Sequence, residues 1–369
     1  MQRTYYCKLH RLPRMKNRSN TLVNRHYTRE NTGTVFLKEG ALKVKVLLVT
    51  GGAGFIGSNF IRFFLKRNKN FIIVNIDKLI QPGSFERLRE IENSPRHHFI
   101  KGDIGNHELV GYIFRRFKPE YIINFAVDGS SNKDSYHHSS LIGTNVGGVL
   151  TLMENARSIW SKKDLASCRF IQISSDEVYG NTLSSDEFFV EEAALNPKTP
   201  FAASKASADL ILRSFSDMYD LPVMSLRCCN SYGPYQNNDF LIPSYIVNAL
   251  NGSAFNINSN TNVREWLHVW DLSIAIIRTL FYGKPGDIYN IGSDEEISDL
   301  DLAREILGIT GGTEDILLRE STNTGKCLRY ALNSYKIQNN LRWKNKLKLK
   351  EGLVETVQWF RNNPAWWSK

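Results

Sequence analysis

The stretch "KVKVLLVTGGAGFIGSNFIRFFLKRN", Lys43 to Asn68, decides the fold of this chain. It begins with a short apolar run, passes through a turn rich in glycine and continues with apolar residues at helical spacing. An apolar run of that length, followed by such a turn, predicts a β-strand, a turn and an α-helix. The main part of the chain therefore opens with a strand–turn–helix unit.

The glycines of this turn, Gly51, Gly54 and Gly57, are spaced G-x-x-G-x-x-G. Glycine permits a tight turn and lets backbone N–H groups approach a pyrophosphate, whose negative charge the start of the following helix favours. The second predicted strand, "NFIIVNID", ends at Asp77, about 20 residues after the last glycine. A carboxylate there accepts hydrogen bonds from an adenosine ribose and repels a 2′-phosphate. The unit therefore predicts a site for NAD rather than NADP, although the neighbouring Lys78 weakens that preference.

Strands and helices continue to alternate along the chain. Four further apolar stretches are predicted strands, "HHFIKGDI", "YIINFAV", "RFIQISS" and "PVMSLRCCN". Segments of helical spacing lie between them, for example "HELVGYIFRRFK" and "GTNVGGVLTLMENAR". This alternation indicates parallel pairing with right-handed crossovers, and strands that are apolar throughout are typical of a sheet with helices on both faces. The predicted fold is α/β, with a doubly wound, Rossmann-like parallel sheet.

Composition excludes several classes of protein. The net charge is +10, but the first 40 residues hold nine Lys/Arg and two Asp/Glu, so the rest of the chain is close to neutral. Binding to nucleic acid is therefore not predicted. Residues 1–42 are predicted to form a basic, disordered extension, with a transit peptide and a polyanion-binding arm as alternatives. The apolar runs are strand-sized, and none approaches the roughly 20 residues of a membrane span.

The five cysteines form no C-x-x-C pair and no cluster with histidine. Neither a metal site nor a disulfide framework is predicted. Reduced thiols are typical of the cytoplasm, which is the predicted location.

Further stretches are shared with one family, among them "NIDKL", "GDI", "NFA", "TNVGG", "SSDEVYG", "SKASAD", "RCCNSYGPYQ", "VREWLHVWD" and "KEGLVETVQWF". On these stretches, between about Lys43 and Trp367, the chain resembles the extended short-chain dehydrogenases/reductases. Among them it is most similar to the nucleotide-sugar 4,6-dehydratases of the dTDP-glucose type. The resemblance implies a lyase that binds NAD and a nucleoside-diphosphate hexose, oxidises C4, removes water across C5–C6 and returns the hydride to C6.

The stretch "SSDEVYG" carries two adjacent carboxyl groups. Water loss after oxidation at C4 needs one group that removes the C5 proton and another that protonates the departing C6 hydroxyl, so the two pKa values must differ. By resemblance, Glu177 is the base, Asp176 the acid, and Ser175 binds the C4 oxygen. Adjacent side chains on a strand point to opposite faces, so both carboxyl groups reach one sugar only if the strand ends there. A C4 epimerase or reductase is an alternative that the paired carboxylates argue against.

The resemblance also implies the remaining site residues. Cofactor contacts are expected at Gly51, Gly54, Phe55, Ile56, Gly57, Asp77, Asp103, Ile104, Ala126, Thr144 and Lys205. Substrate contacts are expected at Ser175, Asn230 and Arg264. A guanidinium suits a diphosphate because it donates two parallel hydrogen bonds.

Phe201 departs from the family. There, a tyrosine four residues before the lysine takes the C4 hydroxyl proton, whereas this chain keeps Lys205 but has no phenol. Three explanations are open: an engineered substitution, an enzyme in which Lys205, Ser175 or a water replaces the tyrosine, and a homologue that binds NAD and a nucleotide sugar without turnover. Departures also occur at residues 126–129, at Asp239 and Phe240, and at 322–330, and their scatter favours natural divergence.

The chain is predicted to contain two interleaved domains after the extension. Residues 43–230 and 263–293 form the NAD-binding domain, and residues 231–262 and 294–369 form a smaller C-terminal domain that binds the sugar nucleotide. Family members pair through two helices, at 140–156 and 199–219 of this chain, and the apolar faces of "TNVGGVLTLMENA" are consistent with that, so a homodimer is predicted.

Overall fold

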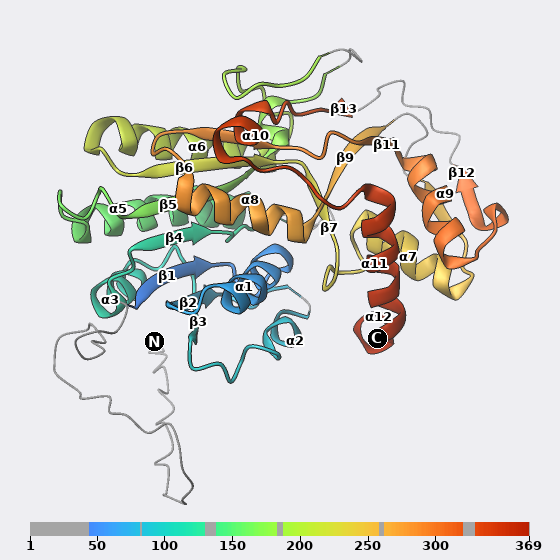
Figure 1. Ribbon diagram of the computed structural model, residues 1–369, viewed down its shortest axis with the longest axis horizontal. Helices are drawn as coiled ribbons and strands as arrows, with labels where there is room; N and C mark the ends of the chain where they lie inside the picture. Colours follow the sequence, from blue (N-terminus) through green and yellow to red (C-terminus); the bar gives the residue numbers. More distant parts are fainter. Residues whose placement is uncertain are drawn as a thin grey trace, which may run out of the picture.

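The structure is a computed structural model that describes residues 44–81, 83–129, 138–182, 187–257, 262–319 and 329–368. The predicted basic extension, residues 1–42, lies outside the described residues. A large sheet with helices on both faces fills one side of the molecule, and a smaller group of elements with the C-terminal helices fills the other (Figure 1). Within the described ranges, no helix combines the length and the apolar character that a membrane crossing requires.

The large sheet confirms the predicted doubly wound α/β fold. Its strands are β1 (Lys45–Thr50), β2 (Phe71–Asp77), β3 (His97–Lys101), β4 (Tyr121–Asn124), β5 (Arg169–Ser175), β6 (Val223–Cys228) and β10 (Ile288–Ile291). They lie in the order β10-β6-β5-β4-β1-β2-β3, and every pairing is parallel. The chain runs outward from β1 in one direction and then from β4 in the other. A crevice for ligands therefore opens at the carboxyl ends of β1 and β4, where the winding reverses.

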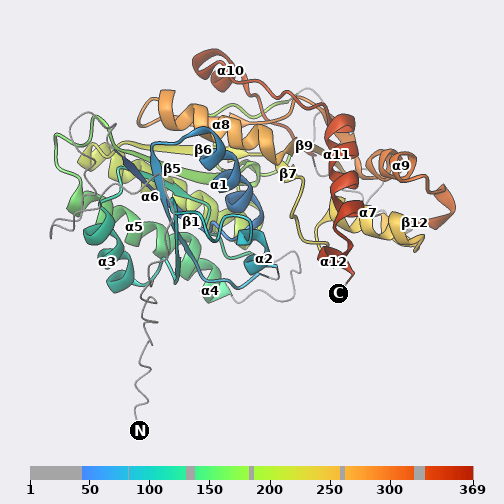
Figure 2. The ribbon, with the colours of Figure 1, turned by 60° about the horizontal axis from the view of Figure 1, so that its bottom comes forward.

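Helices cover both faces of this sheet. The helices beside the large sheet are α1 (Phe55–Arg67), α2 (Ser84–Leu88), α3 (His107–Phe117), α4 (His138–Ile142), α5 (Val149–Ile159), α6 (Pro200–Tyr219), α8 (Val269–Tyr282) and α10 (Tyr335–Leu341). Figure 2 shows α8 and α10 on one side of the sheet and α3 and α5 on the other. Alternate residues of β1 enter opposite cores: Leu47 belongs to the core that contains Phe60 of α1, and Leu48 belongs to the core that contains Phe114 of α3. This explains why the strand is apolar throughout.

The smaller group of elements follows β6. Its strands are β7 (Asn230–Tyr232), β8 (Phe255–Ile257), β9 (Val263–His268), β11 (Glu296–Ser298), β12 (Leu317–Arg319) and β13 (Arg329–Tyr330). Its helices are α7 (Leu241–Asn251), α9 (Asp299–Thr310), the short turn η4 (Glu314–Ile316), α11 (Leu349–Asn362) and α12 (Pro364–Trp367). These elements enclose a core of their own around Tyr245, Ile306 and Leu353. Because α8 and β10 return to the large sheet between β9 and β11, the two groups interleave along the chain. The division into two domains stays a prediction.

The C-terminal helices connect the two groups of elements. Trp366 donates a hydrogen bond from Nε1 to the carbonyl oxygen of Gln236 at 3.0 Å, and its ring lies edge-on to Tyr235. A side chain at Gly83, just before α2, would meet the same indole at 2.8 Å. Trp366 therefore packs between the two groups of elements.

Candidate active site

A cavity of about 430 Å³ lies at the carboxyl ends of β1, β5 and β6. Its wall comes from the glycine turn, the end of β5, the start of α6 and the strands β7 and β9. A second cavity of about 60 Å³ shares several wall residues with it, including Gly51, Gly54 and Phe125, and extends toward β2. One crevice thus brings together segments that lie far apart in the sequence.

The glycine turn approaches its neighbours too closely for any side chain. Gly51 has a φ of +68°, and a Cβ there would lie 2.6 Å from the backbone nitrogen of Ala126. A Cβ at Gly57 would lie 2.5 Å from the carbonyl oxygen of Gly51. Gly54 caps the start of α1 without a side-chain hydrogen bond, and Phe55, Ile56 and Gly57 of the first helical turn line the larger cavity. The start of α1 therefore faces the cavity, as an anion site requires.

The smaller cavity contains the residue that is predicted to bind the adenosine ribose, Asp77. Asp77 lies on its wall and accepts hydrogen bonds from the backbone nitrogens of Ala53 at 2.9 Å and Leu79 at 2.8 Å. Burial raises the pKa of the Asp77 carboxyl above its usual value. Each carboxylate oxygen accepts more than one hydrogen bond, so ribose hydroxyls can share it with the backbone. The predicted residues Ile104, Ala126 and Thr144 line the same cavity.

Asp103 is the one predicted cofactor residue that lines neither cavity. Its carboxylate pairs with Lys78 at 2.8 Å, and Lys78 also donates to Thr144 at 2.9 Å. Lys78 itself lies on the wall of the smaller cavity. The positive charge that weakened the predicted preference for NAD is therefore balanced by Asp103.

The strand β5 ends where the two carboxyl groups begin. Ser175 caps a single 3-10 turn, η3 (Asp176–Tyr179), and accepts a hydrogen bond from the backbone nitrogen of Glu177 at 3.2 Å. Because the chain turns here, Ser175 and Glu177 both line the larger cavity. Asp176 lies behind them with 3% of its surface exposed and is not part of the wall. Burial, and then the charge of Glu177, raise the pKa of Asp176 to about 7.

Helix α6 supplies another part of the wall. Thr199 caps its start, accepting from the nitrogen of Ala202 at 3.0 Å, which places Phe201 in the first turn. Phe201 and Lys205, four residues apart on one helical face, both line the larger cavity. Lys205 is buried and donates from Nζ to the carbonyl oxygen of Ile173. Burial lowers the pKa of Lys205 to about 8.

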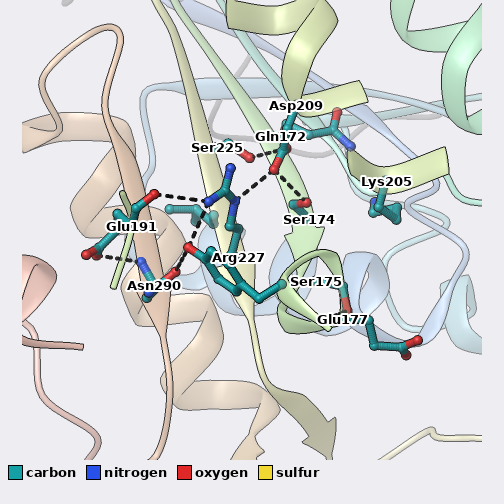
Figure 3. Close-up of polar contacts among 12 residues, drawn as sticks. Gln172, Ser174, Ser175, Glu177, Glu191, Lys205, Asp209, Ser225, Arg227 and Asn290 are labelled. Carbon is teal, nitrogen blue, oxygen red and sulfur yellow. Dashed lines mark hydrogen bonds and ion pairs between the residues drawn. The ribbon is translucent and has the colours of Figure 1, made fainter. Parts of the chain in front are cut away.

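A buried polar network lies beneath this wall. Asp209 pairs with Arg227 at 2.9 Å and accepts from Ser225 at 2.6 Å and Ser174 at 3.2 Å. Arg227 continues the network to the hydroxyl of Tyr179 at 2.8 Å. Figure 3 shows Ser174, Ser225 and Arg227 converging on Asp209, while Glu177 lies apart from them. The network fixes β5, β6 and α6 relative to one another.

The predicted substrate residues come from the smaller group of elements. Asn230 at the start of β7 and Arg264 on β9 both line the larger cavity. The nearest ion pair of Arg264 is long, with Nε 3.8 Å from Oδ1 of the fully buried Asp299. Its Nε makes no hydrogen bond within the described part of the chain. Arg264 therefore fits a role in binding an anion that enters the cavity.

Several wall residues were missed by reasoning from the sequence. Arg87 is fully buried, lines the larger cavity and donates to the carbonyl oxygen of Tyr235 at 2.9 Å. Three more polar atoms on this wall, Ser231 Oγ, Gln236 Oε1 and Trp266 Nε1, have no hydrogen-bond partner among the described residues. Ser231, Gln236 and Trp266 lie within the shared stretches "RCCNSYGPYQ" and "VREWLHVWD". The sequence does not show that they face a cavity, because long-range packing brings them there.

The fold and the crevice together define a dinucleotide-binding α/β protein. A family model described as GDP-mannose 4,6 dehydratase matches residues 48–356. The chain is 34% identical over 346 residues to a dTDP-glucose 4,6-dehydratase of Escherichia coli, covering 88% of this chain and 95% of that protein. The chain belongs to the GDP-mannose 4,6 dehydratase family, so the resemblance found in the sequence is confirmed.

Solved structures agree with this assignment. The dTDP-glucose 4,6-dehydratase of Bacillus anthracis in complex with NAD is 37% identical, with a TM-score of 0.79 over 88% of this chain and 99% of that one. A UDP-glucose 4-epimerase of Thermotoga maritima with UDP-glucose is 26% identical, with a TM-score of 0.77 over 86% and 99%. The likeness is thus greater to the dehydratase than to the epimerase.

Proposed function

We propose that this chain is an NAD-dependent nucleoside-diphosphate-hexose 4,6-dehydratase. The observation that carries the proposal is the position of Ser175 and Glu177 on the wall of the cavity that also contains the glycine turn. A sugar in this cavity would lie within reach of both. The related proteins named dTDP-glucose 4,6-dehydratase support a dTDP-hexose as the first substrate to test.

The site residues fit NAD. The glycine turn and the start of α1 would hold the pyrophosphate, and Asp77 would accept from the adenosine ribose. When bound, the nicotinamide would accept a hydride from C4 of the sugar and later return it to C6. A related dehydratase solved in complex with NAD supports this assignment.

The two carboxyl groups would perform the elimination. Glu177 would remove the C5 proton, which oxidation at C4 makes acidic. Asp176, which lies behind the wall, would supply the proton for the departing C6 hydroxyl through the hydroxyl of Ser175. With its pKa raised to about 7, Asp176 carries a proton in a substantial fraction of molecules near neutral pH. Asn230 and Arg264 would bind the diphosphate side of the substrate, because both line this cavity and Arg264 brings a positive charge to it.

A second candidate function is binding of NAD and a nucleotide sugar without turnover. The observation that favours it is Phe201 on the cavity wall, because no tyrosine is among the wall residues that the structure describes. General acid–base groups contribute about 10²–10⁴-fold to rates, so loss of the phenol alone could leave a very slow enzyme.

We also propose that the chain forms a homodimer and works in the cytoplasm. Four large apolar side chains on neighbouring helices of one face are exposed, Ile142, Leu150, Leu210 and Met218. Exposed apolar patches of this kind mark interfaces. Cys168, Cys228 and Cys229 are free thiols, and free thiols are typical of reducing compartments.

The test is incubation of the purified protein with NAD and a panel of nucleotide hexoses that includes dTDP-glucose. Mass spectrometry should find a product that has lost one water. The Glu177→Gln variant should bind the same sugar nucleotide in calorimetry but form this product at least about 100-fold more slowly. An inactive wild type beside an active Phe201→Tyr variant would instead establish the binding protein without turnover.

A further inference from the structure

The proposed oxidation at C4 needs a group that accepts the hydroxyl proton, and the following inference rests on the proposed function. Phe201 cannot accept a proton, and the wall residues that the structure describes include no tyrosine. The acceptor must therefore be another group that reaches the cavity. Two serines on this wall, Ser174 and Ser175, each donate a hydrogen bond to a buried aspartate.

The pair formed by Ser174 and Asp209 is occupied by structural contacts. Asp209 pairs with Arg227 at 2.9 Å and also accepts from Ser225 at 2.6 Å (Figure 3). Protonation of Asp209 would break a buried ion pair and leave the guanidinium without its partner, which is costly. This pair therefore serves the packing of β5, β6 and α6.

The pair formed by Ser175 and Asp176 is different. Ser175 donates from Oγ to Asp176 Oδ1 at 3.0 Å and accepts from the nitrogen of Glu177 at 3.2 Å. A hydroxyl has one proton and two lone pairs, so one lone pair of Ser175 is left for a sugar hydroxyl. Asp176 is 3% exposed, and its Oδ2 has no hydrogen-bond partner in the described part of the chain. A buried carboxylate with so few donors gains from taking up a proton.

We propose that Ser175 and Asp176 form a proton relay that takes the place of the missing phenol. As the hydride leaves C4 with its electron pair for the nicotinamide, the C4 hydroxyl proton moves to Ser175 Oγ. The proton of Ser175 moves at the same time to Asp176 Oδ1, and the C4–O bond becomes a carbonyl. Serine ends unchanged, Asp176 ends protonated, and NAD is the only oxidant required.

The relay links the two half-reactions. Asp176 must be ionised before the oxidation and protonated after it, which is the state that water loss from C6 requires. Because Asp176 lies behind the wall, it returns its proton to Ser175 Oγ while Ser175 gives the proton taken from the C4 hydroxyl to the departing C6 hydroxyl, which leaves as water. The C5 proton, held by Glu177, returns to C5 when the hydride reaches C6, so the residues regain their starting states.

The surroundings of Asp176 favour such a cycle. The charged and titratable groups that face it come from several elements: Glu177, Cys228, Cys229, Arg264, Glu265 and Tyr330. Burial and Glu177 raise the pKa of Asp176 to about 7, while the hydrogen bond from Ser175 and the charge of Arg264 act against them. Cofactor reduction should therefore speed up as the pH rises through about 7, because only ionised Asp176 can accept the proton.

Lys205 is the competing acceptor. Its Nζ donates to the carbonyl oxygen of Ile173, and burial lowers its pKa to about 8, so part of it is neutral in weakly alkaline solution. Participation of Lys205 alone would make cofactor reduction depend on Lys205 and not on Ser175. The relay and the Lys205 route therefore predict that different variants lose cofactor reduction.

The first test is a single turnover of the full chain with NAD and dTDP-glucose, followed by the absorbance of the reduced cofactor. Asp176→Asn and Ser175→Ala should each reduce NAD at least about 100-fold more slowly than wild type. The control is Ser225→Ala, which removes a serine that donates to the arginine-paired Asp209 and does not line the cavity. It should stay within about threefold of wild type. Adding Phe201→Tyr to Asp176→Asn should restore cofactor reduction but not water loss.

The second test does not depend on turnover. Carbon-13 NMR of labelled aspartate carboxyls in the protein with NAD should identify Asp176 by the signal missing in Asp176→Asn. Ser175→Ala should raise the titration midpoint of Asp176, because it removes a hydrogen bond to the ionised form. An unchanged midpoint would overturn the relay.

The outcomes separate the relay from the proposed function. If the wild type oxidises the sugar and Asp176→Asn still reduces NAD at the wild-type rate, the relay is overturned. The proposed dehydratase function then still stands. If Lys205→Met fails to reduce NAD while Ser175→Ala reduces it normally, the relay is also overturned and the proposed dehydratase function stands. A wild type that neither oxidises nor dehydrates any sugar in the panel overturns both proposals.

Discussion

At the scale of single residues, buried acids in this protein differ in chemistry because their partners differ. Asp209 has an arginine and two serines on its oxygens, so its charge is balanced. Glu265 on β9 is 1% exposed, and its strongest contact is a 3.3 Å hydrogen bond from the nitrogen of Leu332. Burial raises the pKa of Glu265 to about 8. Residue type alone would not separate these acids.

The raised pKa of Glu265 leads to a prediction about how stability depends on pH. Its pKa in the folded protein lies above the ordinary value of 4.5, so the native state holds this proton more tightly than the unfolded chain. The stabilisation is complete below pH about 4.5 and is lost as the pH rises to about 8. The unfolding free energy of Glu265→Gln should therefore fall less than that of the wild type across this pH range, by roughly 2–4 kcal/mol.

Denaturation in urea at a series of pH values measures this effect. The slope of unfolding free energy against pH will not vanish in Glu265→Gln, because the pKa of Asp176 is also raised in the folded protein. The exposed Glu108→Gln serves as control and should leave the slope unchanged. Equal slopes in wild type and Glu265→Gln would contradict the prediction.

The close packing around Gly51 leads to a second prediction at the residue scale, about NAD binding. Alanine there would place its Cβ 2.6 Å from the nitrogen of Ala126 at a φ of +68°, so the turn must shift. Gly51→Ala should lower stability by about 1–3 kcal/mol and weaken NAD binding at least about tenfold, as measured by calorimetry. Gly143→Ala is the matched control, because its added Cβ would meet no atom within 4 Å among the described residues outside its own helical turn. Normal NAD binding by Gly51→Ala would exclude the glycine turn as the pyrophosphate site.

At the scale of elements, α6 combines three roles on one face. Phe201, Lys205 and Asp209 are four residues apart, so the helix presents all three toward the sheet. Asp209→Asn would leave the buried Arg227 without a charge partner and should cost about 3–5 kcal/mol. Chemical denaturation measures this loss. Asp217→Asn on the same helix affects only an exposed pair with Arg213 and should cost less than about 1 kcal/mol.

The sequence predicted the elements of the large sheet well. The first six strands and the glycine turn have local patterns, and the end of β5 at the carboxyl pair follows from the chemistry. The stretch "GTNVGG" was predicted as α-helix but forms one π turn, η2 (Gly143–Gly148), before α5. The burial of Asp176 behind the wall, the ion pair of Asp209 and the position of Arg87 could not be predicted. Each depends on contacts between residues far apart in the chain.

At the scale of the whole molecule, the exposed apolar face of α5 and α6 predicts the oligomer. Leu210 is 57% exposed near the middle of α6, and Leu150 lies exposed on the neighbouring α5. Leu210→Glu should convert the proposed dimer to a monomer in sedimentation experiments, because burying an unpaired carboxylate in an interface is costly. Val354→Glu, an exposed apolar site on α11, is the control and should leave the oligomer intact. A wild type that sediments as a monomer would contradict the proposed dimer.

The late return of β10 to the large sheet limits how this protein can be divided. β10 pairs with β6 only after the chain has passed through α7, β9 and α8. A fragment that stopped after β6 would keep the glycine turn but leave the N–H and C=O groups along an apolar strand open to solvent. Such an edge is a template for aggregation. A minimal soluble fragment for nucleotide studies must therefore retain residues 288–291 or carry charged substitutions along the bared strand.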